Sequence, residues 1–192
     1  MKYVIPFVFG VFLVMACGNN PVGSQHEGSQ YAEHSLGWGR ELAEKVRDQK
    51  LPKGDLFMIS CMDVDDEGKQ EFGIPWQFYF VDPADTSVAL MVAVQYIGNT
   101  TTMWEDSMAV SVTELPDYDS AGPWVTAARD TLGAEYDDWE ENSLLVVANN
   151  DPDLPLVSDV AMLQFVSPDS TRLLNVVIDA DDNTPLVILE LE

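Results

Sequence analysis

Two related stretches decide the fold: FVDPADTSVALMVAVQYIGNT at residues 80–100 and FVSPDSTRLLNVVIDADDNT at residues 165–184. When Ala84 is skipped, eight of their twenty aligned pairs are identical. Both stretches combine an Asp/Pro turn with an apolar run and a second turn that contains Asn-Thr. The same pattern of strand, turn and strand therefore occurs twice in one chain, which indicates an internal repeat.

The distance to a second landmark supports this duplication. Trp38 precedes the first stretch by 42 residues, and Trp124 precedes the second stretch by 41 residues. Such near-equal spacing predicts a repeat of about 80 residues, with one unit at 35–113 and the other at 114–192.

Each unit begins with a helical pattern. Apolar residues recur at helical spacing from Trp38 until Pro52 interrupts them, and again from Trp124 until Gly133. Pro123 suits the first turn of the second helix, where a missing backbone N–H costs nothing. We therefore expect one helix at the start of each unit.

Four strand-like runs follow each helix and are separated by short turns rich in Asp, Pro and Gly. The expected strands are 56–64, 76–82, 87–97 and 103–113, and then 143–149, 159–167, 171–180 and 185–191. Short turns join antiparallel neighbours. The predicted fold class is α+β: a tandem repeat of one helix plus a four-stranded antiparallel meander, with the helices packed on one face of the sheet or sheets.

Alternation along the strands distinguishes the two faces. The side expected to meet the helices carries Val88, Leu90, Val92 and Val94 in the first unit and Leu174, Val176 and Ile178 in the second. The opposite side carries Ala89, Met91, Ala93, Leu173, Asn175 and Val177, and is more apolar than a solvated face requires. Either the two sheets share this side, or it binds a partner.

The start of the chain has the pattern of a signal peptide. Lys2 is followed by an apolar run that ends at residue 16, which is too short to span a membrane. Val14-Met15-Ala16-Cys17 resembles the lipobox of bacterial lipoproteins, which implies cleavage after residue 16 and lipid on Cys17. Gly18 is not the aspartate that retains lipoproteins in the inner membrane, so the resemblance implies the outer membrane in a cell with two membranes. A plain secretory signal is the alternative.

Residues 17–34 are mostly small or polar and predict a flexible tether after the lipidated cysteine. His26 and His34, with Glu27 and Glu33, are expected to be solvated rather than to hold a metal.

Charge and cysteine content restrict the function. The chain has 33 acidic and nine basic residues, and removal of residues 1–16 would leave a formal charge of about −25. Such a surface repels nucleic acid and anionic lipid, so the membrane contact is expected through acyl chains alone. Cys61 lies in an apolar run and is predicted to be buried.

Enzyme classes find little support in the sequence. The only histidines are His26 and His34, at or before the start of the folded part, which disfavours Ser-His-Asp and Cys-His catalysis. No phosphate-binding glycine loop or paired Cys/His ligand set is present, and no cofactor is expected. A hydrolase with two catalytic carboxylates remains an alternative, because 33 acids allow many pairs.

Calcium is a second alternative. Two acidic turns, with Asp63 and Asp65 in one and Asp179 and Asp181 in the other, are weak calcium candidates. The first has Ile74 where an EF-hand requires its closing glutamate, and the second is followed by a strand pattern instead of a helix. Neither turn is an EF-hand.

Several aromatic residues are candidates for partner contacts. Trp76, Phe78 and Phe80 share one strand face and are expected in the core. Trp104 and Trp139 stand among acidic residues and are predicted to be surface anchors, as is Tyr79. The predicted partner-binding set is Tyr79, Met91, Trp104, Trp139, Leu173 and Val177.

The folded part also resembles β-lactamase-inhibitor-like domains and the related PepSY-like domains of exported bacterial proteins. The residues that carry this resemblance are Asp119-Ser120, Ala127-Ala128 and Gly133 around the second helix, and Asn175 to Ala180 before the last turn. The resemblance implies a module that binds or inhibits another protein. We therefore expect a lipid-anchored binding or inhibitor-like module of the cell envelope, not an enzyme, that engages a protein or peptide through an exposed sheet face.

Overall fold

The structure is a computed structural model that describes residues 29–106, 114–148 and 159–191. The first half of the molecule, residues 29–106, contains α1 (Leu36–Lys50), β1 (Asp55–Cys61), β2 (Trp76–Asp82), β3 (Asp85–Val94) and β4 (Thr100–Asp106). The second half, residues 114–148 and 159–191, contains α2 (Gly122–Thr131), the 3-10 helix η1 (Ala134–Tyr136), β5 (Glu140–Ala148), β6 (Asp159–Val166), β7 (Leu173–Asp179) and β8 (Pro185–Leu191). Of the fourth expected strand, residues 107–113 lie outside the described part.

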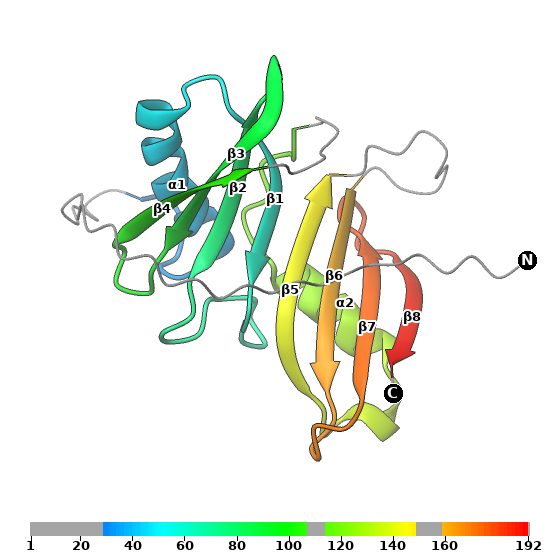
Figure 1. Ribbon diagram of the computed structural model, residues 1–192. Helices are drawn as coiled ribbons and strands as arrows, with labels where there is room; N and C mark the ends of the chain where they lie inside the picture. The colour runs from blue at the N-terminus through cyan, green and yellow to red at the C-terminus, as the bar shows by residue number, and fades with distance from the viewer. Residues whose placement is uncertain (1–28, 107–113, 149–158, 192) are drawn as a thin grey trace, which may run out of the picture.

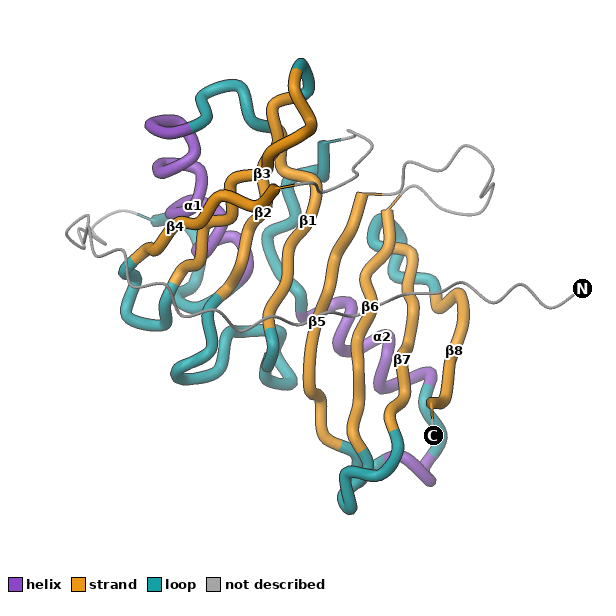
Figure 2. Tube along the Cα trace, viewed as in Figure 1, coloured by secondary structure: helices purple, strands orange, loops and turns teal. Residues whose placement is uncertain are grey.

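All eight strands form one antiparallel sheet in the order β4-β3-β2-β1-β5-β6-β7-β8. The junction is the pair β1 and β5, in which Ile59 lies opposite Val146 and Cys61 opposite Leu144. Figures 1 and 2 show both helices behind the same face of this sheet. The prediction of helices combined with antiparallel strands is confirmed, and the open question of one sheet or two is answered by a single sheet.

Helix α1 begins at a polar cap and covers the first half of the sheet. The Ser35 hydroxyl accepts a hydrogen bond from the backbone N–H of Trp38 at 3.3 Å, which satisfies one of the free donors of the first turn. Leu36, Ala43 and Val46 are buried, and the helix packs on β2, β3 and β4. Pro52 follows shortly after the helix ends, as the sequence predicts.

Helix α2 covers the second half and is five residues shorter, with ten residues against 15. It packs on β6, β7 and β8, and has Pro123 in its first turn. Its buried Trp124 donates from Nε1 to the carbonyl of Ala180 at 3.0 Å, which fixes the helix to the β7–β8 turn.

The core lies between the helices and the sheet. Trp76, Phe78 and Phe80 are fully buried there, as predicted. Val92 of β3 and Val176 of β7 are also fully buried in this core, so the predicted orientation of both valines is confirmed. Burial of each such side chain contributes about 1.5–3 kcal/mol to stability.

The two halves also meet away from the junction strands. Gly68, in the β1–β2 connection, has φ +73°, and a Cβ at this position would lie 2.2 Å from the backbone nitrogen of Gly122 at the start of α2. At the start of α1, the N–H of Gly37 donates to the carbonyl of Asp119 at 2.9 Å. Each half therefore holds the beginning of the other half's helix.

The end of the predicted tether is packed rather than free. Tyr31 packs against the core, and the His34 ring stacks on Tyr96 with ring centroids 3.7 Å apart. The carbonyl of His34 accepts from Trp76 Nε1 at 3.0 Å. The boundary at residue 34 is therefore too late, because aromatic contacts order the chain before the helix begins.

Cys17 and His26, with residues 1–28 as a whole, lie outside the described residues. Within the part of the chain that is described, neither helix has the length and apolar character needed to cross a membrane.

Candidate binding surface

The candidate surface is the sheet face that neither helix covers, called the open face below. One row of opposed residues crosses this face from edge to edge through all eight strands. Because directly opposed residues of neighbouring strands project to the same side, the row shows how the face changes across the molecule. Its members, from β4 to β8, are Thr101, Ala93, Gln77, Ser60, Leu145, Met162, Val177 and Val187.

In the first half the row is polar or small. Gln77 Oε1 accepts hydrogen bonds from the hydroxyls of Ser60 and Tyr79, both at 3.0 Å. Burial raises the pKa of the Tyr79 phenol above its ordinary value. The hydroxyl of Tyr79 is thus committed to an internal network and stays neutral.

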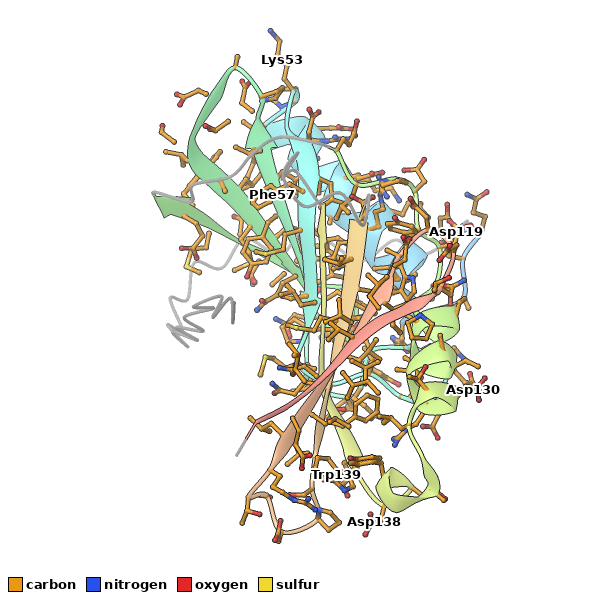
Figure 3. The ribbon with its side chains drawn as sticks, turned by 90° about the vertical axis from the view of Figure 1, so that its right-hand side faces the viewer. Lys53, Phe57, Asp119, Asp130, Asp138 and Trp139 are labelled. Carbon is orange, nitrogen blue, oxygen red and sulfur yellow. The ribbon has the colours of Figure 1, made fainter. Side chains whose placement is uncertain are left out.

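The first half of the open face also has a small buried cluster of its own. Phe57, Val81 and Ala89 are at most 2% exposed and pack with Met58 and Tyr79. Figure 3 shows Phe57 on the side of the sheet away from the helices. Met91, a predicted contact residue, is only 8% exposed and offers a partner little surface.

In the second half the row is apolar and partly exposed. Leu145, Met162 and Val177 are half-buried, and Val187 is 43% exposed. With strands about 4.8 Å apart, these four side chains form a stripe roughly 15 Å long. Leu173 and Leu189 lie on the same face beside the stripe, so two of the predicted contact residues, Leu173 and Val177, belong to one apolar surface.

A polar pair, Gln164 and Asn175, interrupts this surface. The two residues lie opposite each other on β6 and β7, and Asn175 lies opposite Leu189 on β8. Gln164 Nε2 donates to Asn175 Oδ1 at 3.1 Å, and Asn175 is buried. The pair resembles the Ser60, Gln77 and Tyr79 network in the other half, because each consists of hydrogen-bonded polar side chains on neighbouring strands of the open face. Such a pair gives an apolar surface a directional feature that a partner can recognise.

The prediction that Trp139 is a surface anchor is wrong. The ring is 3% exposed, and the Arg172 guanidinium lies 4.9 Å from its centroid while the Tyr136 ring packs edge-on at 5.2 Å. Trp139 immediately precedes β5, so the acidic residues around it, such as Asp138, project to solvent while the indole turns into the core. Figure 3 labels both residues.

Trp104 is exposed as predicted, at 50%, but it lies on the opposite side of the sheet from the open face. It stands opposite Leu90, whose side chain meets the core below α1. On the same side, Lys50 Nζ at the end of α1 donates to Thr102 Oγ1 at 2.6 Å. Trp104 therefore cannot join Leu173 and Val177 in one contact surface.

The acidic turns proposed for calcium lie apart. Asp63 follows β1 and Asp179 ends β7, with β5 and β6 between these strands, a separation of roughly 14 Å or more. Within each turn the carboxylates accept backbone hydrogen bonds: Asp65 from Glu67 and Lys69, and Asp179 from Asp181. Among the described residues, no group of three or more His, Cys, Asp or Glu side chains is placed to hold a metal ion.

A groove of about 350 Å³ lies on the helix side, between α1 and the segment before α2. The Arg40 guanidinium at its wall is nearly buried and pairs with Glu44 at 2.9 Å and Asp117 at 2.6 Å. Nearby, the Tyr118 hydroxyl lies between the carboxylates of Asp159 and Asp181, at 3.1 and 2.8 Å. Burial, followed by these two carboxylates, raises the pKa of Tyr118. Arg40 is thus held by two carboxylates, and Tyr118 by two others.

Cys61 fits its predicted structural role. It is 1% exposed at the junction of the two halves, and burial raises the pKa of its thiol to about 12. A neutral, inaccessible thiol is a poor nucleophile.

Sequence reasoning missed four contributors to the apolar surface: Leu145, Met162, Val187 and Leu189. The signal for the last two was present in the run Leu186-Val187-Ile188-Leu189, which is apolar on both faces of a strand. A buried central strand has this pattern, whereas a strand at the edge of the sheet, as β8 is, exposes it. Only the strand order reveals which case applies.

Comparison with known proteins leaves the family open. No family model and no curated protein matches the chain. Among solved structures, the chain is similar to the crystal structure of a lipoprotein candidate from Clostridium difficile 630. That match has a TM-score of 0.48 and 11% sequence identity, and covers 78% of this chain and 90% of the other.

Proposed function

We propose that this chain is a lipid-anchored, extracytoplasmic binding or inhibitor-like module that engages a protein or peptide through the apolar half of its open face. The observation that carries the proposal is the stripe of Leu145, Met162, Val177 and Val187, flanked by Leu173 and Leu189. Apolar side chains that stay partly exposed side by side on one face are typical of interaction surfaces. The partner is expected to present apolar side chains toward this stripe.

The anchor is part of the same proposal. The lipobox-like segment ending at Cys17 would hold the mature chain at a membrane outside the cytoplasm, the outer membrane where two are present. The acidic surface would keep the folded part off anionic lipid, so that the open face stays available to a partner.

We infer further that the two halves descend from one unit by duplication, as in tandem PepSY-like and β-lactamase-inhibitor-like domains. The same order of one helix and four strands occurs in both halves. The aligned residues Val92 and Val176 are both fully buried under their own helix, and the aligned pair Leu90 and Leu174 is buried as well. A module of this kind needs no cofactor.

The alternative of a two-carboxylate hydrolase gains no specific observation. In the groove beside α1, Glu44 and Asp117 are held in ion pairs with Arg40. Asp159 and Asp181 flank a tyrosine hydroxyl instead of a space for substrate. The calcium alternative likewise lacks a cluster of ligands among the described residues.

Site-specific photo-crosslinking in the native envelope tests the proposed surface. A photoreactive residue is introduced at Met162 or Val177, and, as a control, at Asp130, which is exposed on α2 (Figure 3). We expect the same protein or peptide to be captured from both open-face positions and not from Asp130. The capture should also be lost when Val177→Lys is combined with the photoreactive residue at Met162. Equal capture from Asp130, or capture that survives Val177→Lys, would refute the proposal.

A further inference from the structure

The last strand of the sheet, β8, has an unusual outer edge. It pairs with β7 on one side, and no described strand pairs with it on the other. Four consecutive apolar residues, Leu186 to Leu189, are each 39–47% exposed. Val187 and Leu189 lie on the open face and Ile188 on the helix side, whereas Leu186 stands at an irregularity in the pairing with β7. An edge strand of this kind presents free backbone donors and acceptors between apolar side chains, which is a template for one more strand.

The opposite edge of the same sheet is protected. Strand β4 carries three threonines at Thr100–Thr102, followed by Trp104 and the acidic pair Glu105-Asp106. Lys50 reaches over it to Thr102. Polar and charged residues on an edge discourage pairing with another chain. Strand β8 has a proline only at its first residue, and Glu190 near its end pairs with Arg172 at 3.1 Å.

Charge selects the class of partner. Residues 114–192 contain 18 acidic residues and only two basic ones, Arg129 and Arg172. Both cations are used internally, since Arg129 donates to the carbonyl of Trp139 at 2.8 Å and Arg172 pairs with Glu190. Asp181 and Asp182 lie exposed at one end of β8 and Glu190 at the other. A cationic segment is therefore attracted to this edge, whereas a second copy of the chain is repelled.

We propose that β8 accepts an extended, cationic segment of a partner protein as a ninth strand of the sheet. This inference deepens the proposed function and rests on it, since it names the chemistry of the partner and the way it docks. Backbone hydrogen bonds to β8 supply affinity that is independent of sequence. Apolar residues of the segment extend the stripe past Val187, and Lys or Arg residues at one of its ends face Asp181 and Asp182, beside the start of β8.

Hydrogen exchange with a synthetic probe tests the inference. The probe is the peptide Lys-Lys-Val-Thr-Val-Thr-Val-Thr-Lys-Lys, added to the full chain in neutral detergent and followed by mass spectrometry. Strand addition should slow amide exchange in residues 185–191 by about tenfold or more and leave residues 100–106 unchanged, because only backbone pairing protects edge amides. The effect should weaken as salt is raised.

Control peptides separate backbone pairing from simple charge attraction. A version with Glu in place of Lys should lose the protection, since it is repelled by the acidic half. A version with alternate backbone nitrogens methylated keeps its charge but cannot complete the hydrogen bonds, and should also give none.

Matched variants locate the site. Val187→Lys with Leu189→Lys places two charges on the open side of β8 and should abolish protection. Thr101→Lys with Met103→Lys places the same charges on the open side of β4 and should leave protection of β8 unchanged. Slow exchange of the core strands in both variants shows that they remain folded.

Other outcomes overturn the inference in distinguishable ways. If the probe leaves exchange in 185–191 unchanged, no ninth strand forms. If crosslinking from Met162 and Val177 still captures a partner, the proposed function survives that failure and the partner binds the face alone. Protection of β8 that rises with protein concentration in the absence of peptide would instead identify a second copy as the occupant.

Discussion

In the half of the sheet made by β1–β4, a helix of 15 residues covers one face and buried Phe57, Val81 and Ala89 occupy the other. In the half made by β5–β8, the helix has ten residues and the open face carries a partly exposed apolar stripe. The second half is also the more acidic one: residues 35–113 have seven more acids than bases, and residues 114–192 have 16 more. The comparison teaches that one order of elements can bury both faces of the sheet in one half and leave an apolar stripe partly exposed in the other.

The largest loss of stability is expected from a substitution at Gly68, where the two halves are in close contact. Gly68→Ala must place a Cβ 2.2 Å from the Gly122 nitrogen and adopt a positive φ, so the β1–β2 connection and α2 must separate. We expect a loss of about 4 kcal/mol in the free energy of unfolding, from backbone strain and overpacking together. Urea denaturation measures it.

Gly73 provides the matched control. It also has a positive φ, +89°, but a Cβ there meets nothing within 4 Å. Gly73→Ala should therefore cost only about 1 kcal/mol, the strain alone. Equal losses for the two variants would show that the approach of Gly68 to α2 contributes nothing to stability.

The next effect tests whether the two cores are equivalent. Val92→Ala and Val176→Ala each remove two methyl groups from a fully buried site beneath a helix. We expect each to lower the free energy of unfolding by about 2 kcal/mol, with a difference below about 1 kcal/mol. A much smaller loss at Val176 in urea denaturation would mean that the shorter helix leaves its half loosely packed.

These core positions were also the most predictable part of the fold. Alternation along a strand reports which residues share a face, so the inward valines, the two helices and the antiparallel strands could be predicted from the sequence. Strand order could not, because pairing of β1 with β5 depends on contacts between residues far apart in the chain. Without that order, the apolar run of β8 is indistinguishable from a buried strand.

The candidate site was predictable only in part for a related reason. Leu173 and Val177 follow from alternation, whereas Trp139 was misplaced because acidic neighbours in sequence say nothing about the direction of the indole itself. Trp104 shows a second limit: exposure was predicted correctly, but its side of the sheet depends on register with Leu90.

A smaller change in stability is expected with pH, because the Cys61 thiol is buried at the junction of the halves. The pKa of the Cys61 thiol is raised by burial from 9.0 to about 12, so the unfolded chain loses this proton before the folded chain does. The folded state has no penalty from this group below pH 9, and its stability falls as pH rises from 9 toward 12. At pH 10 the loss should be about 1.4 kcal/mol.

The difference between wild type and Cys61→Ala isolates this contribution from other groups that titrate in the same range. The stability gap between the two proteins should shift in favour of the variant between pH 8 and pH 10, measured by urea denaturation at each pH. A gap that stays constant would contradict the burial of this thiol where β1 and β5 meet.

The smallest effect on stability is expected when an apolar residue of one edge strand and a polar residue of the other are exchanged. Val187→Thr and Thr101→Val alter the two ends of the same cross-sheet row, and both positions are solvent-exposed. Because neither side chain is buried, each change should alter the free energy of unfolding by less than about 0.5 kcal/mol. If Val187→Thr instead destabilises the chain as much as Val176→Ala, the valine belongs to the core and the edge of β8 is a structural element. A neutral result in urea would show that the apolar character of the β8 edge is not required for the stability of the fold.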